Sequence, residues 1–216
     1  MGRWRGSVVL IAAVTMLVSC SVTTGSGNVV SESRNVSGFT KIDLSGAGEV
    51  TIDQNGTEAL TIEAEDNVMP KVTSEVVDGT LRLGEKSSLT INLTKAVKYQ
   101  VSVKELSGLM ISGSGAVTAA KITGPSLAVD INGSGKVTVG GTVENQDVEI
   151  SGSGDYQAKD LQTKITTVKI SGSGAASVAA SDSLDIDMSG SGKLTYYGSP
   201  PQINQQISGS GSVTKG

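Results

Sequence analysis

Short segments in which apolar and polar residues alternate fill the chain from residue 29 onward. Residues 41–44 and 59–63 are examples, and each would place its apolar side chains on one face of an extended backbone. Turn signals such as Asn55-Gly56 and Asp78-Gly79 lie between the segments. The one helix-compatible stretch, residues 66–71, contains a proline that cuts it short. The pattern predicts an all-β protein.

One phrase recurs six times in the second half of the chain, at intervals of 18–20 residues. It consists of an apolar residue followed by Ser-Gly-Ser-Gly or Asn-Gly-Ser-Gly, and its copies begin at Ile111, Ile131, Ile150, Ile170, Met188 and Ile207. A unit of this length cannot bury its own apolar side and must stack on its neighbours. The spacing predicts a parallel β-helix, or solenoid, of about six coils. Parallel β crossovers favour the right-handed form.

Aligning the six phrases places like residues in columns. The second residue after the last glycine is always apolar or aromatic, which predicts a core column: Val117, Val137, Tyr156, Ala176, Leu194 and Val213. The residue before the phrase is mostly polar, which predicts an outward column: Met110, Asp130, Glu149, Lys169, Asp187 and Gln206. The glycines are expected at a corner of each coil, where positive φ or close backbone approach is needed. Replacing Gly152 or Gly172 with Val should therefore destabilise the stack, whereas the same change at Gly27 should not.

The domain of residues 29–216 divides into an irregular part, 29–106, and a regular part, 107–216. The irregular part holds only a degenerate copy of the phrase at residues 44–48, and its longer strands are expected to cover one end of the solenoid. Near the other end, residues 196–201 interrupt the pattern with two prolines. Because proline cannot donate a ladder hydrogen bond, this segment is expected to form a loop or an edge.

The start of the chain has the features of an export signal. Two arginines precede an eleven-residue apolar run that is too short to span a membrane, and Leu17-Val18-Ser19-Cys20 resembles the lipobox of bacterial lipoproteins. We therefore predict a signal peptide over residues 1–19, a lipid-anchored Cys20, and a flexible Gly/Ser-rich tether over residues 20–28. Since Ser21 is not the Asp that marks inner-membrane retention, an outer-membrane anchor is favoured, with the domain facing the periplasm or the cell surface.

Charge and residue content narrow the function. Without residues 1–19 the chain has 15 Lys and Arg against 21 Asp and Glu, a net charge of −6, which disfavours nucleic acid as a partner. Histidine is absent, which excludes Ser-His-Asp and Cys-His catalysis. Cys20 is the only cysteine, so no intramolecular disulfide can form. Only one phrase, at residues 151–155, approaches a calcium-binding repeat, and we expect neither a metal site nor a cofactor.

The order of several motifs resembles a known family. They are residues 36–42, the 66–70 segment before 76–81, the serial Ile-Ser-Gly-Ser-Gly phrases, and a Tyr-Tyr-Gly-x-Pro close at 196–200. Together they resemble the bacterial "putative auto-transporter adhesin, head GIN domain" proteins over nearly all of residues 29–216. The resemblance implies a parallel β-helix-like fold in a secreted or lipid-anchored envelope protein with an adhesive role. It carries over no catalytic or ligand-binding residues.

Two kinds of candidate site follow from the repeats. Hydroxyl and amide side chains flank the corner glycines and would form a ligand-facing strip: Ser112, Ser114, Asn132, Ser134, Ser151, Ser153, Ser171, Ser173, Ser189, Ser191, Ser208 and Ser210. The favoured alternative is that these side chains satisfy corner backbone groups, as Ser and Asn do in turns. Stacked acids, Asp130 beside Glu149 or Glu63 with Glu65, are the candidates for glycoside hydrolysis. No catalytic residue is assigned, because these acids are expected to be ordinary surface groups.

The sequence thus predicts a non-catalytic, lipid-anchored, adhesin-like binding or structural module. Its partners would be the membrane through the anchor and a glycan or an envelope protein. The first alternative is a carbohydrate-active β-helix enzyme, either a polysaccharide lyase or a hydrolase. A lyase would be expected to use arginine, and only Arg34 and Arg82 follow the signal peptide. The second alternative is a self-associating envelope spacer whose open coil end pairs with another copy.

Overall fold

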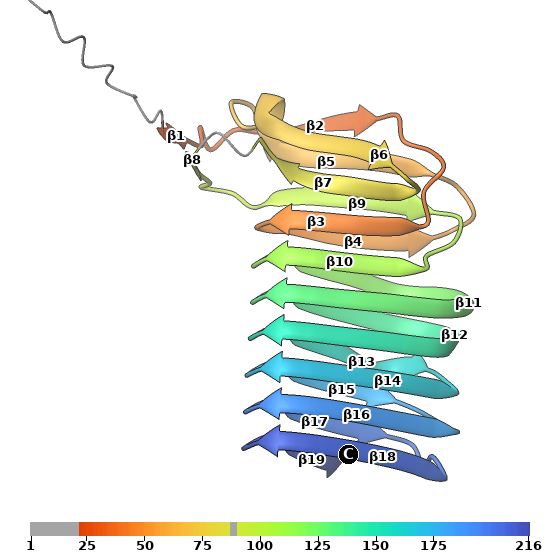
Figure 1. Cartoon of the computed structure of the whole chain (residues 1–216). Coiled ribbons are helices and arrows are strands. Elements are labelled where there is room, and N and C mark those ends of the chain that lie inside the picture. Colours follow the sequence, from red (N-terminus) through yellow and green to blue (C-terminus); the bar gives the residue numbers. More distant parts are fainter. Residues whose placement is uncertain (1–21, 87–89) are drawn as a thin grey trace, which may run out of the picture.

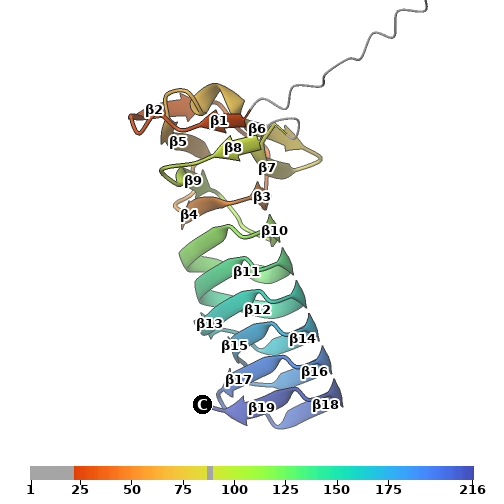
Figure 2. The same cartoon turned by 90° about the vertical axis from the view of Figure 1, so that its left-hand side faces the viewer.

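Parallel strands stack into a β-solenoid of about five turns, with a cap of antiparallel strands at its N-terminal end (Figures 1 and 2). The computed structural model describes residues 22–86 and 90–216. Strands make up 71% of the described residues and helix 2%. The predicted all-β solenoid is therefore confirmed, and the coils wind in the right-handed sense from the cap to the C-terminus (Figure 1).

Each coil consists of two strand layers joined by two corners. The solenoid strands are β10 (Gly108–Gly113), β11 (Ala116–Gly133), β12 (Lys136–Gly152), β13 (Asp155–Gln162), β14 (Ile165–Gly172), β15 (Ala175–Ala179), β16 (Ser183–Gly190), β17 (Lys193–Tyr197), β18 (Gln202–Gly209) and β19 (Ser212–Lys215). We call the strands that run into the glycine phrase the first layer and those that leave it the second layer. The phrase itself is the glycine corner, and the opposite turn is the far corner. β11 and β12 pass through the far corner without a break, so each contributes to both layers.

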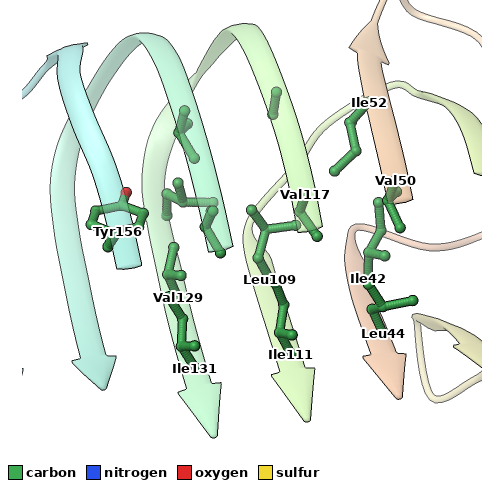
Figure 3. Close-up of a cluster of buried hydrophobic side chains, with 14 of the residues drawn as sticks. Ile42, Leu44, Val50, Ile52, Leu109, Ile111, Val117, Val129, Ile131 and Tyr156 are labelled. Carbon is green, nitrogen blue, oxygen red and sulfur yellow. The ribbon is translucent and has the colours of Figure 1, made fainter. Parts of the chain in front are cut away.

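The register places the six phrases directly above one another. Ile111, Ile131 and Ile150 pair in successive coils, followed by Ile170, Met188 and Ile207. Alternation then turns every second side chain inward, and the predicted core column of the second layer is buried, except that Val213 in the last coil is only partly covered. Figure 3 shows the two layers sending rows of apolar side chains toward each other, with Val129 and Ile131 from one side and Tyr156 from the other.

The cap is built from strands that return to the top of the stack. Its elements are β1 (Val22–Thr24), β2 (Val29–Arg34), β3 (Lys41–Gly46), β4 (Gly48–Gln54), β5 (Ala59–Glu65), the 3-10 helix η1 (Met69–Lys71), β6 (Val72–Val77), β7 (Thr80–Glu85), β8 (Thr90–Asn92) and β9 (Val97–Val103). β3 and β4 form a complete coil whose glycine corner is the degenerate copy at residues 44–48. This coil lies between β10 and β7 in the first layer and between β11 and β9 in the second.

Antiparallel strands then close the top, as the irregular first half predicted. β6 pairs with β7, β5 with β9, and β2 with β5. At the other end of the described chain, β18 is exposed along its whole length, and the inward residues Ile203 and Ile207 are 39% and 40% exposed. The two ends of the solenoid therefore differ: one is covered by antiparallel strands, and the other presents an open coil.

The end of the predicted tether is bound to the cap rather than free. β1 pairs with β8, and the backbone N–H of Gly27 donates to the buried carboxylate of Glu65 at 2.7 Å. The Thr94 hydroxyl also donates to this carboxylate, and these hydrogen bonds hold the pKa of Glu65 below its usual range. Ser26 and Asn28 bond to the Asp66 carboxylate at 2.5 and 2.9 Å. Polar side chains of the cap thus hold residues 22–28 in place. The prediction of a flexible tether, which rested on composition, is therefore wrong for these residues.

The two glycines of each phrase have different roles. Gly152 has φ +116°, and a Cβ built on it would lie 2.7 Å from the carbonyl oxygen of Gly133 in the neighbouring coil. Gly154 has an ordinary φ, but its Cβ would lie 2.5 Å from Cγ2 of the buried Ile131. The first glycine makes the turn, and the second allows the corner to lie against the core of the adjacent coil. Gly27 also has a positive φ, +81°, so it is not the tolerant position that the sequence suggested.

Candidate binding face

The predicted strip exists as two adjacent ladders along the glycine corner. Ser112, Asn132 and Ser151 pair in successive coils, followed by Ser171, Ser189 and Ser208. Ser45 of β3 extends this ladder into the cap. Of the twelve predicted strip residues, eleven are exposed and Ser151 is half-buried. The solenoid therefore brings together every residue of the predicted strip.

The corner backbone does not use these side chains. The N–H of Ser153 donates to the carbonyl of Gly133 at 2.8 Å, and the N–H of Asp155 donates to that of Gly135 at 2.9 Å. The same two bonds recur at the corners that begin at Ile131, Ile170, Met188 and Ile207. Within the described chain, none of the twelve strip side chains takes part in a hydrogen bond to another residue. The favoured expectation, that they satisfy turn backbone, is therefore wrong, and their hydroxyl and amide groups are available to a ligand.

An acidic surface borders the strip on the first layer. The outward residues here include five acids and one lysine: Asp130, Asp147, Glu149, Asp185, Asp187 and Lys169. Three shallow hollows of about 170, 370 and 140 Å³ lie among them. The smallest is also lined by Ser171 and Ser189, so the acidic surface and the strip form one continuous polar face.

Asp130 and Glu149 are neighbours on adjacent strands, as the sequence suggested. Partial burial, together with the negative charge of Glu149, raises the pKa of Asp130 above its ordinary value. The two carboxylates stand side by side on one flat layer and line one shallow hollow of about 170 Å³. Glycoside hydrolysis instead requires two carboxyl groups on opposite sides of the bond that is cut. The placement of this pair suits a polar contact surface better than a catalytic pair.

The raised pKa of Asp130 predicts a pH-dependent change in stability. The pKa of Asp130 is higher in the folded state than in the unfolded state. The ionised carboxylate therefore lowers the free energy of unfolding at pH values above the folded-state pKa, and this penalty disappears when the pH falls below both pKa values. We expect Asp130→Asn to raise the free energy of unfolding at pH 7 by a few tenths of a kcal/mol, a small effect because solvent screens this half-exposed group. Urea denaturation at about pH 7 and about pH 3 measures it, and the advantage should vanish at the lower pH. An equal advantage at both pH values would contradict this explanation.

The other chemical candidates lie in the cap. Glu63 and Glu65 share a strand, but Glu65 is buried under residues 22–28 and its carboxylate is fully engaged there. Arg34 bonds to Glu32 at 2.8 Å and to the carbonyl of Val72 at 2.9 Å. Arg82 pairs with Asp43 in the ladder between β7 and β3, three strand spacings from Asp130 along the same outward column, about 14 Å. Among the described residues, no group of three or more His, Cys, Asp or Glu is arranged to hold a metal ion.

Comparison with known proteins agrees with this architecture. The family described as "putative auto-transporter adhesin, head GIN domain" matches residues 38–200, about three quarters of the chain. The chain belongs to this family. The match runs from just before β3 to just after β17, so it includes most of the cap and most of the regular coils. No curated protein matches the chain significantly.

Solved structures share the head GIN fold at low sequence identity. A "putative adhesin" from Bacteroides fragilis has a TM-score of 0.72 at 23% identity, over 89% of this chain and 99% of that one. A "putative lipid binding protein" from Parabacteroides distasonis has a TM-score of 0.60 at 23% identity, over 91% of this chain and all of that one. At these identities the likeness shows the fold alone. The family description, a putative adhesin, supports a cell-envelope or surface protein.

Cys20, the predicted lipidation site, lies outside the described residues, and no helix within them is long and apolar enough to cross a membrane.

A pair of hollows that the sequence did not indicate lies at the far corner, with volumes of about 400 and 210 Å³. No phrase repeats there. The sequence hint for these hollows is that polar residues recur about once per coil at Thr142, Gln162 and Ser181.

Proposed function

We propose that this protein is a lipid-anchored cell-envelope protein, held through Cys20 at the outer membrane, whose solenoid is a non-catalytic, adhesin-like binding module. The observation that carries the proposal is the strip along the glycine corner. It presents unused hydroxyl and amide groups at the spacing of successive coils, about 4.8 Å. A regular row of hydrogen-bonding groups on a rigid scaffold suits an extended, hydroxyl-rich partner such as a glycan.

The arrangement of the two ends supports an anchored module. β1 lies in the cap, whereas the open coil of β18 and β19 lies at the opposite end (Figure 1). Eight strands stacked in the first layer, from β7 to β18, separate the ends by about 34 Å at the usual strand spacing. An anchor at Cys20 would attach the cap to the membrane and direct the strip away from it.

A glycan array combined with a reducing-sugar assay tests this function. We expect binding without release of sugar ends. Replacing Ser151, Ser171 and Ser189 together with Ala should weaken binding at least about tenfold, because each lost hydrogen bond is worth roughly 0.5–1.5 kcal/mol. The matched control replaces Ser31, Ser33 and Ser37, three exposed serines of the cap, and should leave binding unchanged. Equal affinity of the two triple variants would refute the strip as the binding site.

The reducing-sugar assay tests the first alternative, and light scattering tests the second. Sugar release that disappears in Asp130→Asn or Glu149→Gln would show a carbohydrate-active enzyme in place of an adhesin. The second alternative, a self-associating spacer, is motivated by the exposed Ile203 and Ile207 of the last coil, which a second copy could cover. Light scattering of the purified protein would then show a dimer that Ile203→Lys converts to a monomer, and a monomeric wild type would exclude it.

A further inference from the structure

The far corner holds a trough that none of the repeated phrases lines. Its larger hollow, about 400 Å³, has Gly124, Thr142, Val143, Gln162 and Ser181 among its walls. The smaller one, about 210 Å³, shares Gln162 and Ser181 and continues past Ala179 to Tyr197. Both volumes together fall in the range of small-ligand sites. Because the shared residues join them, the two hollows form one trough along the solenoid axis.

Successive coils form the trough, and backbone bonds fix their spacing. Gly124 pairs with Val143, the N–H of Ser181 donates to the carbonyl of Thr163 at 3.0 Å, and that of Ala180 donates to the carbonyl of Tyr197 at 3.1 Å. From Gly124 to Tyr197 the trough therefore spans four coil spacings, about 19 Å. One hexose of an extended glycan advances by nearly the same distance as one coil, so a linear oligosaccharide would present one sugar to each coil.

The polar side chains on the floor of the trough already have hydrogen-bond partners inside the protein. Val143 and Thr163 are 2% and 5% exposed. The Thr163 hydroxyl donates to the carbonyl of Ala179 and contacts the Thr166 hydroxyl, which in turn reaches the Gln146 side chain. Gln146 donates to the buried Tyr156 hydroxyl. This internal network uses its own polar groups, so it shapes the floor without offering bonds to a ligand.

The rim offers hydrogen bonds and little net charge. The Thr142 hydroxyl and the Gln162 amide form no side-chain hydrogen bond within the described residues, whereas the Ser181 hydroxyl donates to Asp182 at 2.6 Å. Glu144 and Lys164 lie beside them as an ion pair at 2.9 Å. The hydrogen bond between them lowers the pKa of Glu144 and raises that of Lys164, so both stay charged at neutral pH and cancel. Asp182 leaves the rim slightly negative, which disfavours uronates and phosphates.

We propose that the far-corner trough binds a linear segment of a neutral glycan, with about one sugar against each coil. Thr142 and Gln162 supply hydrogen bonds, Val143 and Ala179 supply apolar contact, and the ligand lies along the solenoid axis. The proposal rests on the binding function proposed above and gives it a second site and a ligand class. An enclosed lipid site does not fit, because side chains fill the interior between the layers (Figure 3).

A substitution at Gly124 tests the trough without disturbing the fold. A Cβ added there meets no atom within 4 Å, and its φ lies outside the left-handed region. Gly124→Phe should therefore block the Gly124 end of the trough while the melting temperature stays unchanged, and Gly124→Ala should be too small to block it. Thr118→Phe adds the same ring to the same strand, at an exposed position in the second layer, and serves as the matched control.

Calorimetric titration of the full-length chain with cellotetraose, maltotetraose and chitotetraose supplies the measurement. We expect at least one to bind, with affinity reduced about tenfold or more in Gly124→Phe and about threefold in Gln162→Ala, and unchanged in Gly124→Ala and Thr118→Phe. The inference is wrong if none binds, if Gly124→Phe binds as the wild type does, or if only tetragalacturonate or palmitate binds.

The strip variants separate this inference from the proposed function. If the triple serine variant loses a bound tetrasaccharide while Gly124→Phe retains it, the protein is a binding module with its site at the glycine corner, and the far-corner proposal fails. If Gly124→Phe alone loses it, the trough is the site, and the strip does not bind that sugar.

Discussion

Replacing Gly152 with Val should lower the free energy of unfolding by at least about 3 kcal/mol. A backbone at φ +116° costs a β-branched residue roughly 1–3 kcal/mol in strain. Its Cβ would also lie 2.7 Å from the carbonyl oxygen of Gly133, closer than real Cβ contacts occur. That carbonyl cannot move freely, because it accepts the N–H of Ser153 at 2.8 Å. Gly172 stands in the same position over Gly152, so Gly172→Val should behave alike.

Urea denaturation of the two variants measures the effect, with Gly124→Val as the control. Gly124 lies in the same stack but has an ordinary φ and open space around its Cβ, so its substitution should change stability by less than about 0.5 kcal/mol. Gly27 cannot serve as the control, because its own φ is positive. A loss below about 1 kcal/mol for Gly152→Val would contradict the strained corner and the tight contact between coils.

The regular half of the fold could be read from sequence because its information is local and repeated. One apolar residue, two glycines and an alternating strand recur in each copy, and the stacked register follows once the copies are aligned. The same alignment placed Tyr156 inside and the strip serines outside. Which serine hydroxyls were free could not be predicted, since backbone groups of neighbouring coils compete for the same bonds.

The cap and the far corner depend on contacts that no local pattern encodes. β3 and β4 form a coil between strands that follow them in the chain, so the order in space differs from the order in sequence. Residues 22–28 read as a linker, yet Glu65 and Asp66, about 40 residues away, bind them. The far-corner trough arises where unlike residues of five successive coils meet, with Val143 and Ala179 beside polar side chains.

The second glycine of the phrase offers a separate test of how the coils pack. Gly154→Ala should cost about 1–3 kcal/mol, because the new methyl group would overlap Cγ2 of the buried Ile131, 2.5 Å away. Ile131→Ala alone should cost about 2–5 kcal/mol by leaving a cavity in the core. In the double variant the alanine methyl occupies space that the isoleucine has vacated. The combined loss should therefore be smaller than the sum of the single losses by about 1–2 kcal/mol.

A second pair of substitutions serves as the control for this coupling. Ile170 is equally buried, but its Cγ2 lies under Gly192 rather than Gly154. Gly154→Ala and Ile170→Ala should consequently add within about 0.5 kcal/mol in urea denaturation. Equal coupling in both pairs would mean that alanine at position 154 loosens the whole stack. Coupling confined to Ile131 would show that the second glycine of a phrase leaves room for one side chain of the adjacent coil. That side chain belongs to the apolar residue that begins the preceding copy of the phrase.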